Sequence, residues 1–114
     1  MCRLDVDTPV PAWGQAGSLF CVVWTRDELS IVCDENRVPD GVRVEAGWVA
    51  LKLEGPFPFS MTGVLAAFLR PLAEGNIPIF AISTFDTDFV LIKHEDVERA
   101  VKALGAAGHQ ECSG

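Results

Sequence analysis

The sequence predicts an α+β fold: an antiparallel β-sheet with two helices packed on one face. Two amphipathic helical segments, 61–74 and 95–107, are interleaved with short apolar strands. The first 46 residues repeat the order of strand and hairpin without the helices. We therefore expect two pseudo-equivalent halves whose strands join one sheet. The length of 114 residues fits one compact unit of this kind.

The first half is predicted to be poor in helix. A short alternating strand, Cys2 to Val6, is followed by a link over 8–17 that proline and glycine interrupt too often for a long helix. Two alternating apolar segments, 18–25 and 29–33, predict a hairpin, and the polar loop 34–41 ends it.

Residues 42–53 are predicted to form one long strand that closes the first half and opens the second. Ala46 and Gly47 interrupt its pattern, at a place where a bulge or a sharp bend is tolerated. This strand is the expected junction of the two halves.

The helix over 61–74 has the clearest pattern in the chain. Ser60 is its expected N-cap and Gly75 its expected C′ residue. Pro71 is expected to kink or tighten the final turn, because proline lacks an N–H donor. The apolar residues recur at offsets of three and four and form one face: Met61, Val64, Leu65, Phe68, Leu69 and Leu72.

Residues 77–84 and 88–93 predict a second hairpin, and a second helix follows from about Glu95. Acidic residues in its first turn suit the positive end of the helix dipole, and Gly105 and Gly108 are expected to end it. The tail, 109–114, has nothing to bury and is expected to be frayed.

Composition narrows the class of partner. The chain is 49% hydrophobic, which predicts a self-association face and a homodimer or larger assembly. The net charge is −7 and the nine Lys and Arg are scattered, so nucleic acid is not an expected partner. We expect no membrane segment, because no run reaches about 18 apolar residues. The N-terminus does not resemble a signal peptide, so the expected location is the cytoplasm.

Four cysteines show no spacing typical of a structural zinc site. If the first hairpin turns about Asp27, Cys21 faces Cys33 across the ladder, whereas other turn registers separate them. Two interpretations stay open: small buried hydrophobic residues, or a redox-sensitive pair.

The second hairpin turn, 83–88, carries more acid than a turn needs. Its two carboxylates, Asp86 and Asp88, predict a binding rim. They do not make a metal site by themselves. Neither His94 nor His109 has a nucleophile at a recognisable spacing, so no catalytic residue and no cofactor is expected.

Two stretches, GPFPFSMTG at 55–63 and STFDTDF at 83–89, lie within an order of strand, helix, strand, strand and helix. Together they resemble the ACT-domain family, in particular the small ACT proteins related to the CASTOR arginine sensors and to aspartate-kinase regulatory domains. The resemblance implies a ferredoxin-like βαββαβ sandwich over 47–108. It also implies a degenerate, helix-poor ACT-like half over 1–46.

The resemblance further implies an amino-acid or similar effector site between two ACT units, which signals to a regulated partner in trans. A helix N-terminus suits the effector carboxylate, Asp88 suits its ammonium, and Phe85 can cover its side chain. The implied site residues are Ser60, Met61, Thr62 and Gly63 at the helix start and Thr84, Phe85 and Asp88 at the turn.

Each of these residues also has a plainer interpretation. Ser60 can be only a cap, Gly63 can permit tight packing, Phe85 can belong to the core, and Asp88 can bond its own turn. Two other functions are therefore kept beside the sensor. One is an oligomerisation or scaffold module without a ligand, and the other is a small enzyme using Asp86, Asp88 and His94.

Overall fold

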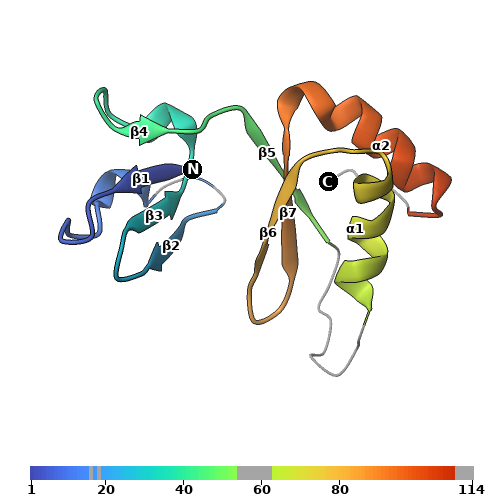
Figure 1. Cartoon of the computed structure of the whole chain (residues 1–114), viewed down its shortest axis with the longest axis horizontal. Coiled ribbons are helices and arrows are strands. Elements are labelled where there is room, and N and C mark those ends of the chain that lie inside the picture. Colours follow the sequence, from blue (N-terminus) through green and yellow to red (C-terminus); the bar gives the residue numbers. More distant parts are fainter. Residues whose placement is uncertain (16, 18, 54–62, 110–114) are drawn as a thin grey trace. The chain divides into compact units, whose positions relative to one another are not determined.

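The computed structural model describes residues 1–15, 17, 19–53 and 63–109. The chain divides into two compact units, Met1–Gly47 and Trp48–Gly114, and each has its own sheet (Figure 1). The α+β class, with antiparallel pairing and two helices, is confirmed. The expectation of one shared sheet is wrong, because the described strands form two separate sheets.

The first unit contains a four-stranded sheet with the order β2-β3-β1-β4. In the strand order of this unit, short 3-10 turns take the positions that helices have in the second unit. The prediction that this half is helix-poor is therefore confirmed. Its elements are β1 (Cys2–Leu4), η1 (Ala12–Gly14), β2 (Cys21–Trp24), β3 (Leu29–Val32), η2 (Glu35–Arg37) and β4 (Arg43–Val44).

Alternation of side chains gives this sheet one buried face. Cys2, Leu29 and Ile31 form the buried centre, and the partly buried rings of Trp13 and Phe20 pack against them. These three centre residues come from the two middle strands, so β1 and β3 hold the core of the first unit together.

The second unit has two helices and a three-stranded sheet with the order β5-β7-β6. Both helices pack on the same sheet face, since the buried core joins Leu72 of α1 and Leu104 of α2 to Val90 and Ile92 of the middle strand. The elements are β5 (Trp48–Lys52), α1 (Val64–Glu74), β6 (Ile79–Ser83), β7 (Asp88–Lys93), η3 (His94–Asp96) and α2 (Val97–Ala106).

The predicted long strand 42–53 is two strands, β4 and β5, that belong to different sheets. The sequence predicted a bulge or bend at Ala46 and Gly47. These residues do interrupt the pattern, but they separate two strands instead of bending one. Gly47 has a φ of +87°, a conformation that glycine adopts without steric cost. Pairing in the first sheet ends just before Gly47: β4 ends at Val44, and Glu45 N–H still donates to Met1 O at 2.8 Å.

Helix α1 begins at Val64, so the predicted start at 61 is not observed and Gly63, with a φ of +82°, occupies the cap position. Ser60, the predicted cap, lies outside the described residues. Pro71 does not end the helix, which continues to Glu74.

The end of α1 also differs from the prediction. The left-handed residue is Asn76, with a φ of +55°, and not Gly75. The N–H groups of Asn76 and Ile77 donate to the carbonyls of Ala73 and Leu72 at 3.0 Å each. These two bonds define a Schellman motif in which Asn76 is C′.

Helix α2 starts two residues after the predicted Glu95 and runs through Gly105. Gly108, with a φ of +94°, allows a second Schellman motif, in which His109 N–H donates to Leu104 O at 3.0 Å. His109 is therefore not part of a frayed tail. Its ring lies 5.3 Å from that of Phe68 and its Nε2 lies 3.2 Å from Ala67 O. The rest of the predicted tail, 110–114, is outside the described residues.

Among the described residues, no helix is both long and apolar enough to cross a bilayer.

Candidate functional site

The β6–β7 turn is held by its own threonine. Thr84 N–H donates to Thr87 O at 2.8 Å, and Thr84 Oγ1 accepts from Thr87 N–H at 3.1 Å and donates to Thr87 O at the same distance. Thr84 therefore fixes the local shape of the turn.

Asp88 is half-buried at the first position of β7. Its Oδ1 accepts a short 2.5 Å hydrogen bond from the hydroxyl of Ser83, its partner across the ladder. An ammonium group approaching this carboxylate would share it with Ser83. Asp88 therefore has a local donor on Oδ1, and a carboxylate can accept further hydrogen bonds.

The same turn is attached to the end of β5. Leu53 N–H donates to Asp88 O at 2.9 Å, and the hydroxyl of Thr87 donates to Leu53 O at 2.8 Å. Thr87 was not among the predicted site residues. The sequence feature that could have indicated Thr87 is the second threonine of the Thr-Phe-Asp-Thr-Asp turn at 84–88. Thr84 closes the turn, and Thr87 attaches it to β5.

Phe85 is 80% exposed, so the interpretation as a core residue is wrong. Asp86, beside it at the tip of the turn, is also exposed. Phe85 and Asp86 are exposed in the turn itself, and Asp88 is the first residue of the strand that follows it. This arrangement is compatible with the predicted rim.

On the helix side, only Gly63 of the four predicted residues is described. A Cβ built at Gly63 meets no described atom within 4 Å, so close packing does not explain this glycine, whereas its positive φ does. The carbonyl of Gly63 accepts the first helical bond, from Ala67 N–H at 2.8 Å. Ser60, Met61 and Thr62 lie outside the described residues.

The turn of the predicted site and the start of α1 lie at one end of the second unit. Figure 1 shows the β6–β7 turn and the first residues of α1 at the same end of the sheet. The turn is bonded to Leu53, the last described residue before the undescribed segment 54–62. The fold therefore brings Thr84, Phe85 and Asp88 to the end of the unit at which α1 presents its N-terminus.

The face of the second sheet away from the helices carries an aromatic pair. The rings of Trp48 and Phe80 meet edge to face with centroids 4.6 Å apart, and Lys93 Nζ lies 4.8 Å from the centre of the Trp48 ring. The indole N–H of Trp48 is buried without a hydrogen-bond partner in the described part of the chain. Trp48 is thus a packing residue, whereas Trp24 is 62% exposed.

The pairing of Cys21 with Cys33 is not observed. A two-residue turn, Arg26-Asp27, shifts the register by one, so Cys21 faces Val32. Cys33 instead neighbours Cys2. Burial raises the pKa of the Cys33 thiol, and the adjacent Cys2 thiol raises it further. Across the described residues, no group of three or more potential metal ligands occurs.

The fold, the strand order and the turn define the second unit as an ACT domain. A family model described as an ACT domain matches residues 43–106, and the chain belongs to that family. A second model, described as an N-terminal domain, matches residues 1–41.

The chain is similar to a solved structure over nearly its whole length. The crystal structure of protein Atu0741 from Agrobacterium tumefaciens matches with a TM-score of 0.88 and 38% identity, covering 99% of this chain and 89% of that one. This likeness confirms the fold.

Two curated relatives are longer proteins. The human protein CASTOR3P is 31% identical over 76% of this chain and 61% of its own length. The bovine cytosolic arginine sensor for mTORC1 subunit 1 is 28% identical over 75% of this chain and 29% of its own length. The chain therefore spans less than two thirds of either relative.

Proposed function

We propose that this chain is a regulatory module that binds an amino acid or a similar small effector between two ACT units. The observation that carries the proposal is the half-buried carboxylate of Asp88, hydrogen-bonded by Ser83, at the β6–β7 turn of an ACT domain. The name of the bovine relative, an arginine sensor, supports the same ligand class.

The proposed site has two chemically different parts. Asp88 would accept from the ammonium of the effector, and the first N–H groups of α1, which follow Gly63, would donate to its carboxylate. Ser60, Met61 and Thr62 are proposed on the helix side, and Thr84 and Phe85 on the turn side. The exposed Phe85 ring would cover the apolar part of the effector.

We further propose that the signal acts in trans, in the cytoplasm, through a homodimer or a regulated protein partner. An effector can shift such an assembly only if it binds one packing state more tightly than the other. The site would then need a second ACT unit, from the first half of the chain or from another copy.

Thermal-shift screening against the common amino acids tests the proposal. A ligand at 100 times its Kd stabilises the folded state by about 2.7 kcal/mol, so a hit raises the melting temperature clearly. Asp88→Asn is expected to abolish the shift. Asp86→Asn is the matched control, because Asp86 is an exposed acid of the same turn, and it should keep the shift.

Asp88→Asn also changes the bond to Ser83, so the unliganded melting temperature must be measured for each variant. A folded Asp88→Asn variant that still responds normally to the hit would contradict the assigned role. No response of the parent chain to any amino acid would instead favour the scaffold function.

The scaffold function, an oligomerisation module without a ligand, has one observation in its favour. Trp24 and Val23 are 62% and 52% exposed on β2, which is an edge strand of the first sheet. Exposed apolar residues on an unpaired edge are suited to association with another chain.

A further inference from the structure

One row of side chains crosses the whole outer face of the first sheet. Val23 pairs with Ser30, Ser30 with Arg3, and Arg3 with Arg43, so the row takes one residue from each of β2, β3, β1 and β4. Because side chains alternate along a strand, the row faces away from the core that contains the sequence neighbours Cys2, Leu29 and Ile31.

Two members of this row are arginines placed directly opposite each other. Residues in such a cross-strand pair have Cβ atoms about 4.5–5.5 Å apart, and like charges at this spacing destabilise the sheet. The chain has nine Lys and Arg and a net charge of −7, so two adjacent arginines are not a by-product of a basic surface.

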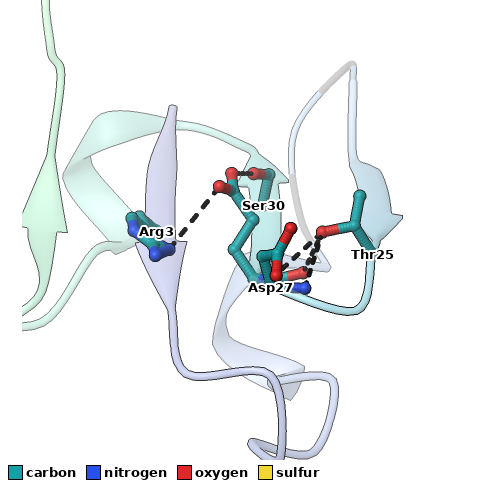
Figure 2. Close-up of polar contacts among 5 residues, drawn as sticks. Arg3, Thr25, Asp27 and Ser30 are labelled. Carbon is teal, nitrogen blue, oxygen red and sulfur yellow. Dashed lines mark hydrogen bonds and ion pairs between the residues drawn. The ribbon is translucent and has the colours of Figure 1, made fainter.

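The charge of the pair is only partly compensated. Glu28 Oε2 lies 3.6 Å from Arg3 Nη1, while Glu28 Oε1 accepts a 2.7 Å bond from the hydroxyl of Ser30 (Figure 2). Both side chains of this ion pair are about two-fifths exposed, which makes it weak. Within the described residues, the Arg43 side chain is exposed and forms no hydrogen bond or ion pair, although its backbone pairs with that of Arg3.

We propose that Arg3 and Arg43 form an oxyanion-binding site on the outer face of the first sheet, separate from the effector site of the second unit. Two planar guanidinium groups, each a fork of N–H donors, match the paired oxygens of a carboxylate or a phosphate. The anion relieves the repulsion between the arginines, and Glu28 weakens its binding by competing for Arg3.

The ligand class follows from charge. The two arginines and Glu28 sum to one positive charge, so a group with one negative charge is sufficient. A free phosphate and the carboxylate of an organic acid share this chemistry, and inorganic phosphate and acetate serve as separate probes.

The test is an NMR titration of the full chain with each probe at constant ionic strength, with sodium chloride as the reference salt. We expect saturable amide shifts around Arg3 and Arg43 with at least one probe. Arg43→Gln should abolish saturation. Arg37→Gln is the matched control, because Arg37 is an exposed arginine of the same unit outside the row, and it should leave the titration unchanged.

Glu28→Gln adds a prediction of opposite sign, since it removes the competing charge. The affinity should rise about two- to fivefold, the range expected for one exposed ion pair. Saturation by phosphate alone identifies a phosphate site, and saturation by acetate identifies a carboxylate site. The proposal is overturned if the amide shifts saturate with neither probe, or if they equal the shifts caused by sodium chloride. It is also overturned if saturable shifts persist in Arg43→Gln.

Discussion

At the scale of the residue, the thiol of Cys33 shows how tertiary contact changes chemistry. Burial first, and then the neighbouring Cys2 thiol, raises the pKa of Cys33 above its ordinary value. The folded state therefore holds this proton more tightly than the unfolded state. The resulting stability is fully present below the pKa of the unfolded thiol and is lost as the pH rises through the higher pKa of the folded thiol.

Alkylation of Cys33 by iodoacetamide should therefore require a higher pH than alkylation of an unperturbed thiol, because the thiolate is the nucleophile. Mass spectrometry of the labelled peptide against pH measures this. Cys2→Ser should move the Cys33 profile to lower pH, whereas Cys21→Ser, the control, should leave it in place. A Cys33 profile that matches a free thiol in the parent chain would contradict the prediction.

Asp88 belongs to the same scale. The acidic turn predicts Asp88 as a site residue, but the sequence contains no information about the bond that Asp88 accepts from Ser83. That bond depends on the ladder pairing of the two residues, which only the folded hairpin fixes.

At the scale of the element, the ends of the helices are set by backbone conformation more than by residue preference. Gly75 was the expected C′ residue of α1, yet Asn76 adopts the left-handed conformation. The burial of Ile77 and Leu72, 4% and 0% exposed, gives the reason, because the motif that uses Asn76 brings this apolar pair together.

Asn76→Ala should destabilise the chain by about 1 kcal/mol, because a left-handed conformation penalises a Cβ that lacks a compensating polar group. Asn76→Gly should be tolerated, since glycine adopts this conformation freely. Urea unfolding of both variants measures the difference. Equal stability of the alanine and glycine variants would argue against strain at this position.

The hairpins illustrate the same point about elements. Both hairpins were predicted, because alternation of apolar residues is a strong local signal. For the second hairpin, the predicted strands also contain all the residues that pair. The register of the first was open, since a change of one residue in the turn moves every pair. The Thr25–Glu28 turn decided it: Thr25 N–H donates to Glu28 O at 2.9 Å.

At the scale of the whole molecule, the two units repeat one strand order. The middle strand, β3 or β7, lies between its hairpin partner and the first strand of its unit. The domain limits 1–46 and 47–108 remain our proposal. The self-association predicted from composition also belongs to this scale, because it concerns surfaces and not single elements.

Light scattering of the purified chain should give twice the chain mass of 12.3 kDa, or a larger multiple. Trp24→Ser should reduce the mass if the exposed edge strand β2 carries the association. Val10→Ser is a control, since Val10 is an exposed apolar residue outside the strands. A parent chain that stays at the monomer mass at every concentration, with and without a hit ligand, would contradict the prediction.

The sequence by itself determined the α+β class, both hairpins, both helices, the helix-poor first half and the ACT resemblance. The hairpins and helices depend on short periodic patterns, which reflect local propensity and the burial of one face, and the class and the resemblance follow from the order of these elements along the chain. Tertiary structure alone decided that the strands form two sheets, that Cys33 meets Cys2, and that Arg3 and Arg43 share a row. These features join residues far apart in the chain, so they depend on which strands pair and in which register, and no local pattern specifies that.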